Sequence, residues 1–269
     1  MKTISSYDNS YIKYARNLKQ RKYREKEGKY LVEGIRLLED ALQAGIVLEA
    51  VFFTEKLRTR ARGEVLLKRC QQLGSSCYQV PDSLLDSLAD TDTPQGIIGI
   101  ACIPRLNIAE IISGTGLLLV VDQVQDPGNL GTILRTAEAV GCEGVLLSVG
   151  TVDPYNSKVL RASMGAAFRL PLRLDVELLE LLKELKAKGY QIVAADLATD
   201  NLYWQVGLTL PGALVVGNEG RGICPEVLAV VDDRVKIPLR EGVDSLNVAV
   251  ASGIILYDWL RQAGGQLPG

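Results

Sequence analysis

The chain has 269 residues, of which 47% are hydrophobic and 23% charged, and its formal net charge is −2. That composition can bury one large core or two smaller ones, and it favours a two-domain enzyme. No stretch approaches the roughly 18 consecutive apolar residues of a membrane span. The polar N-terminal segment lacks the pattern of a secretory signal, so we expect a cytoplasmic protein with no membrane partner.

The sequence contains no histidine. This excludes the Ser-His-Asp triad, the Cys-His dyad and histidine zinc sites, so the chemistry must use carboxylates, Ser, Asn, Lys, Arg, Tyr or backbone groups. The cysteines are odd in number, scattered and without a C-x-x-C pair, which indicates ordinary thiols in a reducing compartment and no metal. They are Cys70, Cys77, Cys102, Cys142 and Cys224.

The net charge hides an asymmetry. Nine of the 30 basic residues but three of the 32 acidic ones lie within residues 1–30, so this segment carries +6 and the remainder −8. Tyrosines lie among these cations and could stack on bases or sugars while the cations bind phosphates. A pair of solvated helical faces is the alternative. The tyrosines are Tyr7, Tyr11, Tyr14, Tyr23 and Tyr30, and a second basic cluster comprises Lys56, Arg58, Arg60, Arg62, Lys68 and Arg69.

The first hundred residues alternate between helical and strand patterns. An apolar stripe of helical period predicts a helix over 31–44, ending at Gly45. Strands are predicted over 48–54 and 96–103, with a helix over 60–73 between them. The segment 104–116 contains a proline and two glycines, and it predicts a junction between one domain at 1–104 and a second domain at 113–269.

The second half has a stronger α/β pattern. The run LLLVVDQV at 117–124 is typical of a strand buried on both faces of a parallel sheet. Further strands are predicted over 144–149, 191–195, 213–216 and 234–238, with helices between them and a last helix over about 246–262. This alternation predicts an α/β fold with a parallel sheet covered on both faces.

Three segments of this half carry candidate site residues. The first is DPGNLGTILRTAEAVG at 126–141, in which Asn129 is expected to cap a helix that Gly141 ends. Arg135 would lie near the helix N-terminus, where the dipole favours anions, and could grip a phosphate or ribose. The alternative is a capped helix with an exposed arginine.

The second segment is ALVVGNEGRGICPEVL at 213–228. Its G-x-x-G-x-G order is the reverse of the dinucleotide fingerprint, and no Gly-Lys-Ser/Thr follows, so it is neither a NAD site nor a P-loop. A glycine loop at the carboxyl end of a parallel strand indicates a ligand site, with Glu219 at its centre. A simple turn into a helix is the alternative.

The third segment is VKIPLREGVDSLNVAVASGIILYDWL at 235–260. A strand is expected to end at Ile237-Pro238, and Ser245 to cap the last helix, whose first turn would carry Leu246 and Asn247. Small residues allow close approach of another backbone: Ala249, Ala251, Ser252 and Gly253. By itself this segment could be a plain capped helix.

Together these segments resemble the signature motifs of the SpoU/TrmH family of RNA ribose 2′-O-methyltransferases, within the SPOUT class. The motifs are N-x-x-x-x-x-R-T-A at 129–137, G-N-E-G-x-G at 217–222 and S-L-N-V-A-V-A at 245–251. The likeness covers about 113–269. The N-terminal half is similar to the family's substrate-binding domain, related to ribosomal-protein RNA-binding folds, through KYLVEGIRLLEDAL and TPQGIIGIA.

The resemblance implies a deep trefoil knot, against the general rule that chains are unknotted, and a homodimer with S-adenosylmethionine bound in the knot. It implies catalytic or substrate-positioning roles for Asn129, Arg135, Glu219, Ser245 and Asn247. It also implies cofactor binding by Val216, Gly217, Asn218, Gly220, Ile237, Pro238 and Leu246.

The implied substrate is structured RNA, with 23S ribosomal RNA favoured over tRNA because an added RNA-binding domain suits a large folded substrate. Since a guanidinium has a pKa above about 12, we expect Arg135 to orient the target phosphate rather than to act as a base, with Glu219 or a substrate phosphate as proton acceptor. A non-catalytic RNA-binding protein and a conventional nucleotide-dependent α/β enzyme are the alternatives from other classes.

Overall fold

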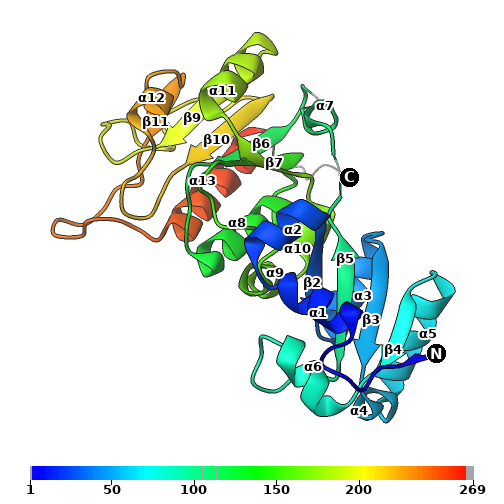
Figure 1. Cartoon of the computed structure of the whole chain (residues 1–269). Helices are drawn as coiled ribbons and strands as arrows, with labels where there is room; N and C mark the ends of the chain where they lie inside the picture. Colours follow the sequence, from blue (N-terminus) through cyan, green and yellow to red (C-terminus); the bar gives the residue numbers. More distant parts are fainter. Residues whose placement is uncertain (1, 105, 113, 265–269) are drawn as a thin grey trace. The chain divides into compact units, whose positions relative to one another are not determined.

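The computed structural model describes residues 2–104, 106–112 and 114–264, and it divides into two compact units. Unit 1 contains the described residues of 1–105 together with Tyr155–Phe168. Unit 2 contains 106–154 and the described residues from Arg169 onward. Each unit has its own sheet (Figure 1). The segment Tyr155–Phe168 lies in sequence within the predicted domain 113–269 but packs in unit 1.

Unit 1 is built on a five-stranded mixed sheet in the order β1-β4-β3-β5-β2. Its strands are β1 (Lys2–Thr3), β2 (Lys29–Glu33), β3 (Leu48–Phe53), β4 (Ser76–Gln79) and β5 (Ile97–Cys102). The strand β5 pairs antiparallel with both β2 and β3, whereas β4 pairs parallel with β3 and β1. Its helices are α1 (Ser10–Asn17), α2 (Arg21–Glu27), α3 (Ile35–Gln43), α4 (Glu55–Arg58), α5 (Ala61–Gln72), α6 (Asp82–Leu88), α9 (Ser157–Ala162) and α10 (Ala166–Arg169), whose last residue belongs to unit 2.

One core cluster of unit 1 joins α1 and α6 to the central strands. Ile12 and Leu84 bring these helices against Phe52 and Ile100, all with no exposed surface. Strand residues of opposite parity, such as Val51 and Phe53, are also fully buried, so the central strands are covered on both sides.

The predicted helix over 31–44 is wrong in its first four residues. Leu31, Val32 and Glu33 belong to β2, where they pair with β5. Gly34 then turns the chain at φ +99°, and α3 starts at Ile35. Leu31 belonged to the helical stripe by spacing alone, and pairing with a distant strand decided its structure.

Not all of the tyrosine side chains near the N-terminus are accessible for stacking on RNA bases. Tyr30 is fully buried and packs against Tyr155, with ring centroids 4.6 Å apart, and against Phe168. Tyr7 and Tyr11 remain exposed. Stacking on bases is therefore excluded for Tyr30 and remains a prediction for the exposed rings.

Unit 2 is built on a six-stranded sheet in the order β11-β9-β10-β6-β7-β8, and neighbouring strands pair in parallel. Its strands are β6 (Leu117–Val121), β7 (Gly144–Ser148), β8 (Leu172–Val176), β9 (Gln191–Ala195), β10 (Gly212–Val216) and β11 (Asp233–Val235). Its helices are α7 (Ile108–Ile111), α8 (Pro127–Ala139), α11 (Leu178–Ala187), α12 (Pro225–Leu228) and α13 (Val248–Gln262). The predicted parallel α/β sheet is confirmed, and the trefoil knot stays a prediction.

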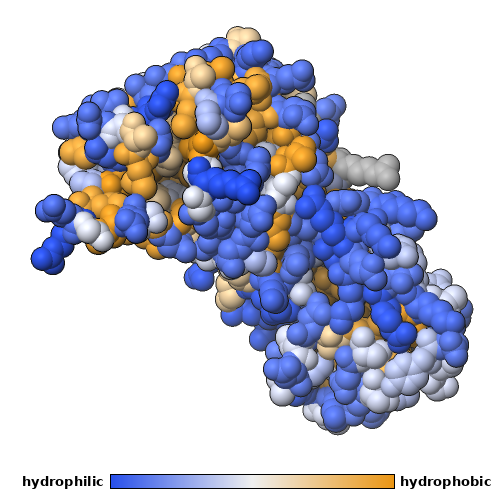
Figure 2. All heavy atoms as spheres, turned by 60° about the vertical axis from the view of Figure 1, so that its left-hand side comes forward, coloured by the Kyte–Doolittle hydropathy of each residue, from blue (hydrophilic) through white to orange (hydrophobic). Residues whose placement is uncertain are grey.

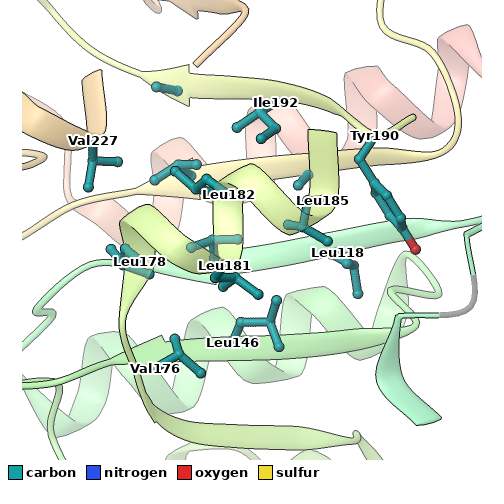
Figure 3. Close-up of a cluster of buried hydrophobic side chains, with 14 of the residues drawn as sticks. Leu118, Leu146, Val176, Leu178, Leu181, Leu182, Leu185, Tyr190, Ile192 and Val227 are labelled. Carbon is teal, nitrogen blue, oxygen red and sulfur yellow. The ribbon is translucent and has the colours of Figure 1, made fainter. Parts of the chain in front are cut away.

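Two helical layers cover this sheet. On one face, Leu181, Leu182 and Leu185 of α11 pack against sheet residues such as Leu118 and Ile192 (Figure 3). On the other face lie α8 and α13, which pack against each other. The fully buried Trp259 of α13 donates its indole N–H to the carbonyl of Thr209, 3.0 Å away.

Two predicted strands of this unit are too long. The strand predicted over 117–124 ends at Val121, and Gln123 then adopts φ 54°. The strand predicted over 234–238 is Asp233–Val235, so Ile237 and Pro238 lie in the loop that follows. Past β11, the apolar residues Ile237 and Leu239 line the cavity of the candidate active site. Past β6, Val124 is instead fully buried in the protein.

All five cysteines are free thiols. Burial raises the pKa of Cys70 and of Cys142 to about 12, so neither thiol ionises near neutral pH. We expect alkylation of the native protein at pH 8 to modify the partly exposed Cys102 and Cys224 first. Mass spectrometry of native and unfolded samples checks this order, and rapid native labelling of Cys142 would contradict it.

Among the described residues, no helix combines the length and the apolar character needed to cross a bilayer.

Candidate active site

The carboxyl ends of β9, β10 and β11 lie together at one edge of the parallel sheet, beside the starts of α8 and α13. A cavity of about 700 Å³ opens there. In this sheet the chain steps outward from β6 to β8 and then crosses to the other side for β9. A ligand site is expected where strand order reverses, outside the carboxyl ends of the strands.

The start of α8 presents Asn129 to the cavity. Asp126, rather than the predicted Asn129, is the N-cap: its Oδ1 accepts from the backbone N–H of Asn129 at 2.8 Å, and Pro127 occupies the first helical turn. Because another residue caps the helix, the amide side chain of Asn129 is available for other contacts.

The start of α13 presents Asn247 to the same cavity. Asn247, rather than the predicted Ser245, is the N-cap, and its Oδ1 accepts from the backbone N–H groups of Ala249 and Val250 at 2.9 and 3.3 Å. Its Nδ2 donates to Asn129 Oδ1 at 2.7 Å. The helix cap therefore fixes the oxygen of the Asn247 amide, and this orientation directs the amide N–H toward Asn129.

Glu219 completes this chain of hydrogen bonds. Its Oε1 accepts from Asn129 Nδ2 at 3.0 Å and from the backbone N–H of Asp126 at 3.1 Å, and its Oε2 accepts from the N–H of Gln125 at 3.2 Å. Burial raises the pKa of this carboxyl, but the hydrogen bonds from Asn129, Asp126 and Gln125 outweigh it, so the pKa lies below its ordinary value. Glu219 is therefore ionised at neutral pH and a weak base.

The glycine loop after β10 closes on itself. The backbones of Asn218 and Gly222 exchange two hydrogen bonds of 2.9 Å, and Asn218 Oδ1 accepts from the N–H groups of Gly220 and Arg221, both at 3.0 Å. At Gly217 a Cβ would lie 2.4 Å from the carbonyl carbon of Gly222. A residue larger than glycine at 217 cannot be accommodated without moving the loop.

Buried Asp122 anchors this loop from beneath. Its Oδ2 accepts from the backbone N–H of Cys224 at 3.0 Å, and its Oδ1 accepts from Ser148 Oγ at 3.3 Å. Sequence reasoning assigned Asp122 to a predicted strand and missed this role. Its position, directly after the last residue of β6, is the signal that could have identified it.

The structure gathers all but two of the predicted site residues around the cavity. The lining includes Asn129, Val216, Gly217, Asn218, Glu219, Gly220, Ile237, Ser245, Leu246 and Asn247. Pro238 does not line the cavity, although its neighbours Ile237 and Leu239 do. Arg135 lies on the exposed side of α8 outside the cavity, and no described residue forms a hydrogen bond or ion pair with its side chain.

A further wall of the cavity was not predicted. It consists of Ala195 at the end of β9 and the residues Asp196, Leu197 and Ala198 that follow. Asp196 Oδ1 accepts from the N–H of Ala198 at 3.1 Å. The buried Oδ2 lies 3.7 Å from Arg234 Nη1 in an ion pair but accepts no hydrogen bond from the described part of the chain. An acidic residue directly after a strand of the predicted sheet was the available signal.

The cavity suits a cationic ligand with a flat apolar part. Three carboxylates line it, from Asp196, Glu219 and Asp244, against a single guanidinium, that of Arg221. Its apolar walls can hold a ring system. Asp196 Oδ2, which accepts no hydrogen bond from the described residues, can accept one from a hydroxyl or ammonium group. S-adenosylmethionine has this combination, since it carries a sulfonium, an ammonium and an adenosine. The apolar lining includes Leu197, Val216, Ile223, Ile237, Leu239 and Leu246.

Two family models match the chain. The model of the SpoU rRNA Methylase family matches residues 116–257, which contain most of unit 2. The model of the MRM3-like substrate binding domain matches residues 9–99, within unit 1.

Individual proteins match over nearly the whole chain. The 23S rRNA (guanosine(2553)-2′-O)-methyltransferase RlmP of Bacillus subtilis is 35% identical, over 96% of this chain and 98% of its own. The AdoMet-bound rRNA methyltransferase of Sinorhizobium meliloti has a TM-score of 0.87 at 30% identity, covering 97% of both chains. AviRb of Streptomyces viridochromogenes, in complex with AdoMet, has a TM-score of 0.84 at 26% identity, covering 94% of this chain and 98% of that one.

Proposed function

The chain belongs to the SpoU rRNA methylase family and is an S-adenosylmethionine-dependent methyltransferase, and from this premise we propose that it methylates a ribose 2′-hydroxyl of 23S ribosomal RNA. The observation that carries the proposal is the hydrogen-bonded chain of Asn247, Asn129 and Glu219 at the rim of the cofactor cavity. Support for the RNA comes from the substrate named for the Bacillus subtilis relative and from the match to a substrate-binding domain.

We place the cofactor in the cavity at the carboxyl ends of β9, β10 and β11. Gly217 allows the backbone of Gly222 to pack closely against it, which closes the glycine loop at the cavity wall. Leu246 and Ile237 supply apolar walls, and Asp196 supplies a hydrogen-bond acceptor. When bound, the cofactor supplies an electrophilic methyl group on a sulfonium, whose positive charge is lost on transfer. Carboxylates in the lining therefore favour the charged donor over its neutral product.

We assign positioning roles to the polar groups at the rim. The reaction joins the ribose oxygen to the methyl carbon, breaks the sulfur–carbon bond and releases the hydroxyl proton. Glu219 already accepts three hydrogen bonds and has a lowered pKa, which argues against it as the proton acceptor. It instead holds Asn129 in place. Because a phosphate oxygen of the RNA is a still weaker base, we propose that the hydroxyl proton is released to solvent water as the methyl group is transferred.

The experiment that tests the function combines cofactor binding with RNA mapping. Calorimetry should show binding of S-adenosylmethionine and none of NAD. Incubation with labelled cofactor and total RNA from a strain lacking the protein should then label the large ribosomal RNA, at a ribose 2′-oxygen found by nuclease mapping. Label confined to tRNA, or to a base, would overturn the proposal.

We expect Arg135→Lys to lower kcat on RNA by about 10- to 100-fold, because lysine keeps the charge but loses the planar fork that binds a phosphate. The affinity for the cofactor should not change, since Arg135 lies outside the cavity. Single-turnover rates and calorimetry measure the two effects. Arg173→Lys, at an exposed arginine of β8, is the matched control. Full activity of Arg135→Lys would show that the orienting role is wrong.

We propose that the protein acts as a homodimer through the exposed side of α13. Val250 and Tyr257 lie two turns apart on this helix and are each 52% exposed. Figure 2 shows hydrophobic residues gathered over unit 2, whereas the visible surface of unit 1 is mainly hydrophilic. Of the small residues of this helix, Ala249 and Ser252 are buried within the chain, whereas Ala251 and Gly253 are half-buried. Sedimentation velocity tests the dimer.

We infer that the enzyme works in a reducing compartment such as the cytoplasm, where its five free cysteines would stay reduced.

A further inference from the structure

A second cavity, of about 300 Å³, lies within unit 1 and is lined by four cations and one carboxylate. Lys19 follows α1, Arg24 belongs to α2, and Lys158 and Arg161 belong to α9. The carboxylate is that of Asp90, just after α6. We call this cavity the basic groove. The catalytic assignment uses none of these residues.

Two of the four cations hold the groove together. Arg24 is buried, and its Nη1 donates to the carbonyls of Leu18 and Lys19 at 2.9 and 2.8 Å. Lys19 donates to the carbonyl of Ala89 at 2.8 Å and forms an ion pair with Asp90 at 2.9 Å. These contacts fix the wall made by α1 and α2, and they engage the only carboxylate of the lining.

The other two cations are less engaged, although the charge of Arg161 interacts with that of Asp90. The side chain of Lys158 is exposed and forms no ion pair with any described residue. Arg161 Nη1 is buried, yet within the described chain no acceptor lies within hydrogen-bond distance of it. A buried donor without an acceptor is costly, and guanidinium donors match the oxygens of a phosphate. Lys158 and Arg161 lie three residues apart and so share one side of α9.

We propose that the basic groove binds a backbone phosphate of the RNA, with Arg161 and Lys158 as its ligands. The proposal rests on the proposed function, since it requires an RNA substrate. A phosphate fits better than a base, because Tyr155, the aromatic residue of the lining, is 5% exposed and already packs on Tyr30. It therefore has no free face on which a base could stack.

The segment of the chain between β7 and β8 that packs in unit 1 supplies the two proposed ligands. Lys158 and Arg161 belong to Tyr155–Phe168, whereas the N-terminal part of the unit supplies Lys19 and Arg24. Phosphate contacts fix the register of a nucleic acid and carry no sequence information. The basic groove thus positions the RNA and leaves the choice of nucleotide to other contacts.

The test compares Lys158→Ala, Arg161→Ala and the double variant with Lys183→Ala, which removes an exposed, unpaired lysine of α11 in unit 2. The probe is a labelled transcript of 23S ribosomal RNA, titrated by fluorescence anisotropy at several salt concentrations. We expect each groove variant to raise Kd roughly tenfold and the double variant to lower the slope of log K against log salt by about one to two. The affinity for S-adenosylmethionine and the kcat at saturating RNA should match the control.

The outcomes separate this inference from the proposed function. If the wild type binds the cofactor but methylates no RNA, the proposed function fails. If the wild type methylates RNA and the double variant has the Kd and salt slope of Lys183→Ala, the basic groove is not a phosphate site. Should Arg161→Ala unfold, Lys158→Ala and the milder Arg161→Gln, which removes the charge but keeps most of the side chain, decide the matter through the same salt slope.

Discussion

We expect Gly217→Ala to weaken binding of S-adenosylmethionine by more than about 100-fold and to abolish methylation. The new Cβ would lie 2.4 Å from the carbonyl carbon of Gly222 and 2.5 Å from both its oxygen and the nitrogen of Ile223. All three are backbone atoms, so no side-chain rotation relieves the overlap. The loop must open, and the paired backbones of Asn218 and Gly222 then separate at the wall of the cofactor cavity.

Calorimetry with the cofactor measures the effect, and thermal unfolding shows whether the fold persists. The matched control is Gly207→Ala, also in unit 2, where a Cβ would meet no atom within 4 Å and the residue does not line the cavity. The control should bind the cofactor like the wild type. Wild-type affinity in Gly217→Ala would show that the cofactor does not depend on the closed form of the glycine loop.

The sequence predicted which segments carry Asn129 and Asn247, but it did not predict the local roles of these two residues. Asn129 and Asn247 were expected at the starts of two helices, and both are found there, directed into one cavity. The predicted N-caps were wrong in both helices: Asp126 instead of Asn129 caps α8, and Asn247 instead of Ser245 caps α13. Asp, Asn and Ser are nearly equal as N-caps, so when several adjoin, the sequence does not determine which one accepts the hydrogen bond.

Two features needed the three-dimensional structure. The return of Tyr155–Phe168 to unit 1 has no compositional boundary, because the segment reads as ordinary helix in a continuous α/β pattern. Asp196 lines the cavity because β9 lies next to β10 in the sheet. The strand that precedes β9 in the chain is β8, which lies at the opposite edge of the sheet, so chain order did not indicate this neighbour. Strand order is set by long-range packing, which hydrophobic periodicity does not encode.

We expect Glu219→Gln to lower kcat/KM on RNA by about 10- to 100-fold. Three donors converge on the carboxylate, from Asn129 and from the backbones of Asp126 and Gln125. A glutamine offers one oxygen and places an NH₂ group against a donor, so a charge-assisted hydrogen bond worth about 1.5–3 kcal/mol is lost, and each 1.4 kcal/mol is about tenfold. Asn129 loses its support, and with it the amide that Asn247 contacts.

The pH dependence distinguishes this positioning role from that of a general base that titrates near neutral pH. The pKa of Glu219 lies below its ordinary value of 4.5, so its hydrogen bonds contribute fully above that pH and are lost as pH falls through the lower, folded-state value. The ratio of wild-type to Glu219→Gln activity should therefore stay constant from pH 6 to 9. The matched control is Glu138→Gln. Glu138 lies near the other end of α8, where it forms an ion pair with Arg169, and this variant should retain wild-type activity. A ratio that rises through neutral pH would mean that Glu219 takes the proton, because only an acceptor with a raised pKa titrates in that range.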